Sequence, residues 1–236
     1  MNSDYNEMQP FGSYAGPAES LSGYATKTFG WMFLGLLTTF AVSIATLFTG
    51  LIYYTATGYT PFLLALCELA VVIWMSARVH KLSIGAARGL FFAYAVLNGI
   101  TFSSLLIIYD LGVLLFVFGM TALYFGIMAL YAFFTKADLT RIRPVLIGGL
   151  IVLLVLTLLS MFINLSSFST GICIVGVVIF VAFTAYDTQM IRRNYYYFQG
   201  NPEMLAKASI FSALQLYLDF INLFLYLLRL FGRRSD

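Results

Sequence analysis

The sequence predicts an all-α membrane protein, a bundle of seven transmembrane helices with the N-terminus cytoplasmic. Two observations carry this prediction. Hydrophobic residues make up 61% of the chain and charged residues only 10%, whereas soluble domains carry about 25% charged residues. The apolar residues also gather in long runs, and a helix needs about 20 such residues to cross a bilayer.

Six apolar runs are clear, and they cover residues 28–50, 61–77, 89–108, 111–134, 144–164 and 170–191. A seventh run, 208–231, is apolar but interrupted by polar residues. Only helices and closed barrels satisfy their backbone groups in lipid. These runs are too long and too continuous for barrel strands, so each is expected to form a helix.

The first 26 residues differ in composition from the rest of the chain. They are rich in Ser, Gly, Pro and Tyr, and they lack the basic start and apolar stretch of a signal peptide. We therefore expect residues 1–26 to be a disordered cytoplasmic tail, followed by one transmembrane domain over residues 27–236.

Orientation follows from the basic residues, because cytoplasmic loops are enriched in Lys and Arg. The connections after the second, fourth and sixth runs are basic, and those after the first, third and fifth hold no Lys or Arg. The amino terminus is therefore expected in the cytoplasm. A seventh full span leaves Arg229, Arg233 and Arg234 outside, whereas a re-entrant segment keeps them inside. We favour the full span, because the earlier loops usually set orientation.

Three acidic residues lie inside the predicted spans: Glu68, Asp187 and Asp219. A charged side chain at bilayer depth costs several kcal/mol, so such residues are functional candidates. Simpler roles remain open at this stage. Asp187 could reach the membrane interface close to Arg192, and Glu68 could be a neutral, hydrogen-bonded structural group.

The register of the last two spans places the two aspartates at one depth. In the connecting "FQGNPE", Asn201 can cap and Pro202 can start a helix. Asp187 lies 16 residues before Glu203 (203 − 187) and Asp219 lies 16 after it (219 − 203). In an antiparallel hairpin the pair would lie about 24 Å from the tip, at 1.5 Å per residue, toward the cytoplasmic side.

Polar residues also follow helical spacing within the spans. The last span carries a stripe at steps of 3 and 4, formed by Ser212, Gln215, Asp219, Asn222 and Tyr226. The third run carries Tyr94, Asn98 and Thr101 in the same way. Such stripes can be hydrogen-bonding contacts between helices. The alternative is a polar path through a central last helix whose polar face is hidden from lipid.

Two carboxyl groups held close together do not both ionise cheaply, so one keeps its proton and the two titrate as a pair. The protonated pair would tie the last two spans together. The doubly ionised pair would repel or recruit a hard cation such as Ca²⁺, with Asp187 and Asp219 as its ligands. Arg78, at the end of the second span, could replace the lost proton. These residues suggest a pH-responsive latch on a cation path.

The segments "FTAYDTQ" and "LYLDFINLFLYLLRLFG" resemble the transmembrane Bax inhibitor motif (Bax inhibitor-1) family, and most closely its bacterial inner-membrane branch. "GYATKTFGWMFLGLL" and "YAVLNGITFSS" fit the same pattern. The resemblance covers nearly the whole chain after the tail. It implies a multi-pass protein of the bacterial inner (plasma) membrane with seven helices, the last of them central.

The resemblance also implies a function. Family members are associated with a pH-sensitive calcium leak gated by a di-aspartyl sensor, here Asp187 and Asp219. Glu68 and Arg78 match an acid and an arginine that act as pore and latch in some members. Calcium is then the transported ion and no cofactor is expected. A membrane-bound ATP-dependent protease is a partner of some bacterial members.

Two alternatives from other classes stay open. The chain could regulate a membrane protease or a stress response without transport. It could also be an intramembrane aspartyl protease, but the second aspartate lies in "LYLD" rather than Gly-x-Gly-Asp, and the Pro-Ala-Leu segment of such proteases is missing. We therefore expect no enzymatic activity. Nucleic-acid binding is also not expected, because the chain has no basic face or reader motif.

Overall fold

The computed structural model describes residues 19–55, 57–78, 81–159, 163 and 168–232, and these residues form helices and their connections without strands. The helices run in the following order: α1 (Leu21–Phe48), α2 (Ile52–Thr55), α3 (Thr60–Ala77), α4 (Ile84–Phe102), α5 (Leu105–Ile108), α6 (Leu111–Phe134), the 3-10 helix η1 (Leu139–Ile142), α7 (Arg143–Leu159), α8 (Ser169–Phe198) and α9 (Pro202–Phe231).

Six stretches of the described chain are long and apolar enough to cross a membrane: α1, α4 with α5, α6, η1 with α7, α8 and α9. The predicted second span, α3, is a shorter apolar helix. Its 18 residues rise about 27 Å, close to the roughly 30 Å of a hydrocarbon core. The predicted count of seven spans therefore depends on α3.

Helix boundaries extend beyond several of the predicted spans. The α1 helix begins at Leu21, inside the predicted tail of residues 1–26, because the Ser20 hydroxyl accepts a hydrogen bond from the Gly23 amide at 3.1 Å and caps the helix. Residues 1–18 of that tail lie outside the described residues. Hydropathy marks the hydrocarbon core, whereas the helix itself continues into the interface.

The predicted 89–108 span is distorted near its end, although its backbone stays helical. Ser103 and Ser104 separate α4 from α5. Their hydroxyls donate to the carbonyls of Ile100 at 2.6 Å and Thr101 at 2.8 Å, so the side chains compete with the helical backbone at this point. The predicted 144–164 span ends as α7 at Leu159, and most of the residues that follow lie outside the described chain.

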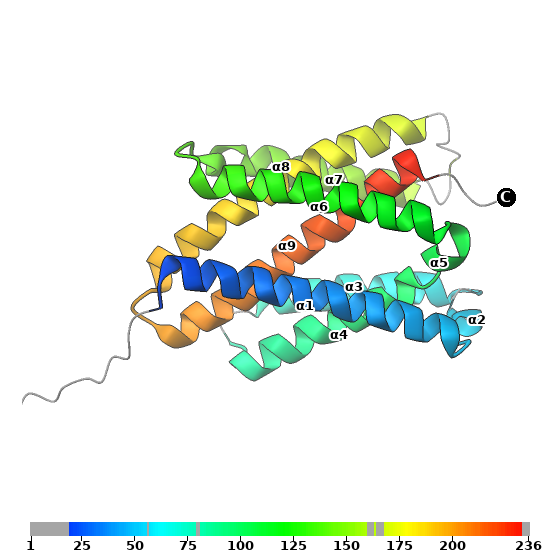
Figure 1. The fold of residues 1–236 in the computed structure, drawn as a ribbon, viewed down its shortest axis with the longest axis horizontal. Helices are drawn as coiled ribbons and strands as arrows, with labels where there is room; N and C mark the ends of the chain where they lie inside the picture. The colour runs from blue at the N-terminus through cyan, green and yellow to red at the C-terminus, as the bar shows by residue number, and fades with distance from the viewer. Residues whose placement is uncertain (1–18, 56, 79–80, 160–162, 164–167, 233–236) are drawn as a thin grey trace, which may run out of the picture.

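Two layers of helices pack on either side of α9 (Figure 1). The first layer contains α1, α3 and α4, and the second contains α6, α7 and α8. The α9 helix runs obliquely between them and packs against α1 and α4 on one side and α6 and α8 on the other. The layers are joined mainly through this helix.

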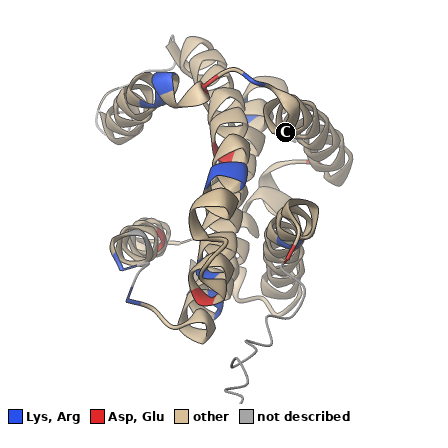
Figure 2. Ribbon diagram, turned by 90° about the vertical axis from the view of Figure 1, so that its left-hand side faces the viewer, with Lys and Arg blue, Asp and Glu red and all other residues tan. Residues whose placement is uncertain are grey.

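One end of the bundle gathers the start of α1, the α3–α4 and α6–α7 connections and the α8–α9 turn. We call it the basic end, because the basic loops of the sequence lie there, and Figure 2 looks onto it. The predicted hairpin turn forms at this end. Asn201 caps α9 by accepting the Met204 amide at 3.0 Å, and Pro202 is its first residue.

The α9 helix is far more buried than the other membrane-length helices. Its most apolar stretch is 72% buried, against 33% or less for the other five. Between Lys207 and Arg229, all residues that are not buried lie on one face with steps of 4 and 3, and this uncovered stripe comprises Phe211, Gln215, Leu218, Asn222, Leu225 and Arg229.

The uncovered stripe corrects one detail of the sequence prediction. The polar face of the last span was expected to be hidden from lipid on all sides. Ser212, Asp219 and Tyr226 are buried, but Gln215 is exposed and Asn222 is only half-buried. The reason is packing, since α9 packs extensively against four helices rather than six.

Close approach between α1 and α4 depends on glycine. A Cβ atom at Gly99 would lie 2.7 Å from the Thr39 carbonyl oxygen and 2.7 Å from the Val42 Cβ. At the same crossing the Thr39 hydroxyl lies 2.7 Å from the Tyr217 hydroxyl and 3.0 Å from the Ala95 carbonyl oxygen. One buried threonine therefore joins α1, α4 and α9.

Candidate functional site: a buried pair of aspartates

Asp187 of α8 and Asp219 of α9 meet inside the bundle. Their side chains are hydrogen-bonded to each other, and the residues are only 5% and 4% exposed. Both lie within helices long and apolar enough to span a membrane. The register about Glu203 thus corresponds to a direct contact between the two carboxyl groups.

The hydrogen bond requires a proton, because two ionised carboxylates are acceptors only. Oδ1 of Asp187 and Oδ2 of Asp219 are buried, and in the described part of the chain no other group donates a hydrogen bond to them. The neighbouring Thr188 hydroxyl is also buried without a partner there. The two carboxyl groups are thus buried with few partners other than each other, which suits a pair that exchanges protons or cations.

Few other charges act on the pair. The guanidinium of Arg143, the first residue of α7, interacts electrostatically with Asp187. The α6 helix carries no Asp, Glu, Lys or Arg. In α1 the one charged residue, Lys27, pairs with Glu19 at 3.5 Å, and in α9 Lys207 pairs with Glu203 at 2.7 Å. Arg143 is thus the cation that complements the pair.

The α6–α7 connection is fastened to α8 just beyond Asp187. The buried Gln189 amide accepts the Leu139 backbone N–H at 2.9 Å and donates to the Ala137 carbonyl at 2.7 Å. Arg192 donates to the carbonyls of Phe133 and Thr135, which end α6, at 3.2 and 3.3 Å. We call these contacts the loop clasp.

Asp138 also helps to hold the α6–α7 connection against α8. Asp138 caps η1 through the Thr140 hydroxyl at 2.6 Å and the Thr140 amide at 3.1 Å, and it lies 3.7 Å from the Arg193 guanidinium. The Thr140 hydroxyl hydrogen bond, followed by the amide hydrogen bond and the nearby Arg193 and Arg141 charges, lowers the pKa of Asp138. The connection that leads to Arg143 is therefore held at several points.

We expect Gln189→Ala to lower the free energy of unfolding by about 1–3 kcal/mol, because it leaves the Leu139 N–H and the Ala137 carbonyl without partners. Thermal unfolding in detergent measures the loss, and hydrogen exchange at Leu139 should accelerate. The exposed Gln199 at the end of α8 provides the control, and Gln199→Ala should change neither. Unchanged exchange at Leu139 in Gln189→Ala would contradict the clasp.

A second polar contact lies between α3 and α4. The Thr101 hydroxyl donates to Glu68 Oε1 at 2.6 Å, so two residues predicted separately are in direct contact. Asn98, one turn earlier on α4, is 3% exposed. The Glu68 carboxyl group is therefore hydrogen-bonded at membrane depth.

Arg78 lies apart from both aspartates. It is exposed at the end of α3, with its guanidinium 5.9 Å from the centre of the Trp74 ring. Among the described residues it forms no ion pair with Asp187 or Asp219. The Arg192 that follows Asp187 does not pair with it either, since its guanidinium binds the end of α6.

The polar residues of α9 divide between two environments. Ser212 is buried and accepts a hydrogen bond from the Asn194 amide of α8 at 3.1 Å. Gln215 and Asn222 lie on the uncovered stripe, and the Asn222 amide donates to its own helix at the Leu218 carbonyl, 2.8 Å away. Asp219 is buried beside that stripe.

Arg143 and Gln189 are the site residues that sequence reasoning missed. Gln189 stands in the quoted "FTAYDTQ", two residues after Asp187, but its partners lie about 50 residues away in a loop. In the sequence, Arg143 served only as one of the basic loop residues that indicate the orientation in the membrane. Neither belongs to a periodic pattern, so only the folded arrangement identifies them.

The fold and the site define a multi-pass helical membrane protein with a pair of hydrogen-bonded carboxyl groups between two of its spans. Comparison with known families then gives its place. The profile of the family described as "Inhibitor of apoptosis-promoting Bax1" matches residues 21–236. The chain belongs to this family, the Bax inhibitor-1 family, as the resemblance in the sequence indicated.

Bacterial relatives cover nearly the whole chain. It is 37% identical over 228 residues to the inner membrane protein YbhL of Escherichia coli (strain K12), covering 92% of this chain and 94% of the relative. A Borreliella burgdorferi protein is 37% identical (90% and 93% covered), and a Deinococcus radiodurans protein is 38% identical (90% and 91% covered). The similarity to an inner membrane protein, together with the membrane-length helices, indicates a multi-pass inner-membrane protein.

Proposed function

We propose that this protein is a pH-sensitive calcium leak channel of the bacterial inner membrane, gated by Asp187 and Asp219, with no enzymatic activity. The observation that carries the proposal is the buried hydrogen bond between these two carboxyl groups, which joins α8 to α9. A membrane protein rarely retains two acids at this depth without a use for them.

The proposed gate follows from the protonation state of the pair. With one proton shared, the carboxyl groups attract each other and hold α8 against α9. Without that proton, two negative charges repel across the same contact, or a cation enters between them. Opening of the α8–α9 contact at this pair is thus linked to proton loss or exchange.

The uncovered stripe supplies a polar route beside the gate. Gln215 is exposed and Asn222 is half-buried on the uncovered stripe of α9, and Asp219 lies next to them. We propose that cations move along this side of α9, with Ser212 at the basic end of the route. In this proposal α3 completes seven spans, and α9 is the helix around which the others are arranged.

Glu68 and Thr101 form a second polar contact in the other layer, with the buried Asn98 one turn earlier on α4, and we propose that these residues line the same route when the layers move apart. Ca²⁺ takes six to eight oxygen ligands. In the described chain no third Asp, Glu, His or Cys joins Asp187 and Asp219. The ion would therefore pass the pair with most of its water.

We propose two arginines with different roles at the gate. Arg143 acts electrostatically on Asp187 in the present arrangement. Arg78 lies outside the pair and would latch a carboxylate after the proton has left. The proposal thus keeps the predicted latch residue and adds a cation on the opposite layer.

Calcium flux into dye-loaded liposomes tests the proposal. We expect purified protein to raise the flux above that of protein-free liposomes, with a rate that changes between pH 5 and pH 9. Flux equal to that of empty liposomes at every pH would contradict the channel. In that case the regulatory role, with a membrane-bound ATP-dependent protease as partner, would be the function to examine.

A further inference from the structure

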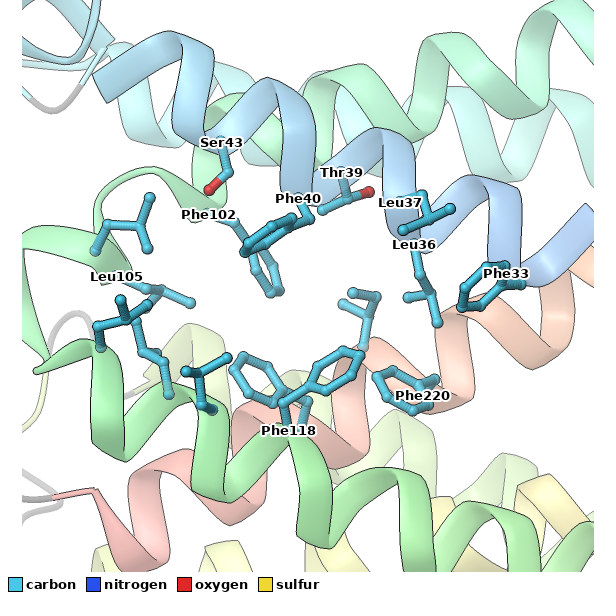
Figure 3. Close-up of a pocket in the computed structure, with 16 residues that line it drawn as sticks. Phe33, Leu36, Leu37, Thr39, Phe40, Ser43, Phe102, Leu105, Phe118 and Phe220 are labelled. Carbon is cyan, nitrogen blue, oxygen red and sulfur yellow. The ribbon is translucent and has the colours of Figure 1, made fainter. Parts of the chain in front are cut away.

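A cavity of about 330 Å³ lies between the two layers, and no residue of the uncovered stripe lines it (Figure 3). Its walls come from α1, the α4–α5 region and α6, and its floor is α9 through Phe220, Ile221 and Phe224. Phe224 and Asn222 are about 160° apart around the helix at 3.6 residues per turn. The cavity is therefore separate from the aspartate site and its polar route.

The lining is apolar except at two positions. Sixteen residues line the cavity, and all but Thr39 and Ser43 are Phe, Leu or Ile. The Thr39 hydroxyl is already bonded to Tyr217 and α4. Ser43 is 4% exposed, forms no hydrogen bond within the described chain, and points its hydroxyl into the cavity (Figure 3). The cavity thus offers one unused hydrogen-bond donor in an apolar space.

The open side of the cavity faces the hydrocarbon of a membrane. Phe40 of α1 and Leu115 of α6 line it and are 51% and 58% exposed on helices of membrane length. Apolar cavities hold water poorly, and α1 and α6 make little direct contact. An occupant that enters from the bilayer therefore meets apolar walls of a size typical of ligand sites.

The position of Ser43 indicates which part of a lipid it meets. It lies five residues before the end of α1 at Phe48, about 7.5 Å along the helix axis at 1.5 Å per residue. Its hydroxyl is therefore just inside one end of the span, near the depth at which lipid chains join their headgroups. An ester carbonyl at that depth accepts the hydrogen bond that Ser43 can donate.

A negatively charged side chain beside the cavity lining favours one kind of lipid headgroup. Asp110 is the residue directly before Leu111, which lines the cavity, and its exposed carboxylate has no ion pair among the described residues. This carboxylate repels an anionic headgroup and attracts a cationic one, and among cationic headgroups only a primary ammonium group can also donate hydrogen bonds to it.

We propose that this cavity is a lipid-binding site for phosphatidylethanolamine. One acyl chain lies along the phenylalanine walls over α9, its ester carbonyl accepts a hydrogen bond from Ser43, and its ammonium group lies near Asp110. The bound chain fills the gap between α1 and α6. The site does not depend on ion conduction.

Native mass spectrometry tests the site on protein extracted from vesicles of equal phosphatidylethanolamine, phosphatidylglycerol and phosphatidylcholine. We expect one phosphatidylethanolamine retained per chain. Ser43→Ala should weaken retention about three- to tenfold, the range for one hydrogen bond. Leu115→Trp, which fills the cavity from its open side, should abolish retention. Wild type that retains no lipid, or mainly another headgroup, would overturn the proposal.

The matched control is Val152→Trp, on an exposed position of α7 that does not line the cavity. It should retain lipid as wild type does. Each variant is first checked for a single gel-filtration peak and wild-type helix content. A folded Leu115→Trp that still retains phosphatidylethanolamine at the wild-type level would also overturn the proposal.

Discussion

Asp219→Asn and Asp187→Asn are each expected to remove the pH dependence of calcium flux, bringing the ratio of rates at pH 5 and pH 9 from about tenfold toward one. Two charges 4 Å apart repel by about 4 kcal/mol at an effective dielectric constant of 20. A tenfold change in rate needs only about 1.4 kcal/mol. An asparagine keeps a hydrogen bond to the remaining carboxyl group but carries no charge, so the repulsion does not arise.

The control for this experiment is Asp110→Asn, which changes an exposed carboxyl group at the start of α6 in the same chemical way. It should preserve the wild-type ratio. Liposome flux at five or more pH values, with equal protein in each preparation, measures the effect. Wild-type ratios in both Asp187→Asn and Asp219→Asn would show that the pair does not set the pH response.

Gly99→Ala is expected to lower the free energy of unfolding by about 2–3 kcal/mol through overpacking. The added Cβ would lie 2.7 Å from the Thr39 carbonyl oxygen, and that backbone atom has little freedom to move. The α1–α4 crossing must open, which also disturbs the hydrogen bonds that Thr39 makes with Ala95 and Tyr217. At roughly 2–4 °C per kcal/mol, the melting temperature in detergent should fall by about 5–10 °C.

Gly89 provides the matched control within the same helix. A Cβ at Gly89 has nothing within 4 Å, so Gly89→Ala should keep or slightly raise stability by restricting the unfolded chain. A Gly99→Ala variant as stable as Gly89→Ala would show that the two helices do not approach as closely as described.

Hydropathy and periodicity were sufficient for much of the fold. The predicted 111–134 span coincides with α6 (Leu111–Phe134), and the cap at Asn201 and Pro202 forms as the sequence indicated. The distortion between α4 and α5 was not visible, because Ser103 and Ser104 distort the helix only when their hydroxyls bind the preceding turn. The composition shows that a span is apolar, but it does not show whether serine hydroxyls bind the carbonyl groups of the helix.

The site was predictable where it depends on register and not where it depends on packing. The equal distances from Glu203 placed Asp187 and Asp219 at one level, and they are in contact. The spacing of Gln215 and Asp219 placed them on one face, but it could not indicate that Gln215 is uncovered. The contact between Glu68 and Thr101 joins two helices, and no pattern within one helix encodes it.

The central claim is that one proton shared by Asp187 and Asp219 controls the flux. Infrared difference spectroscopy of the protonated carboxyl C=O band, recorded with calcium flux on the same proteoliposomes across pH, tests it most directly. We predict that the titration midpoint of this band equals that of the flux in wild type, and that the midpoint shifts in Asp187→Asn and in Asp219→Asn, where the remaining carboxyl group no longer faces a second one. A flux that changes over a pH range in which this band stays constant would contradict the account.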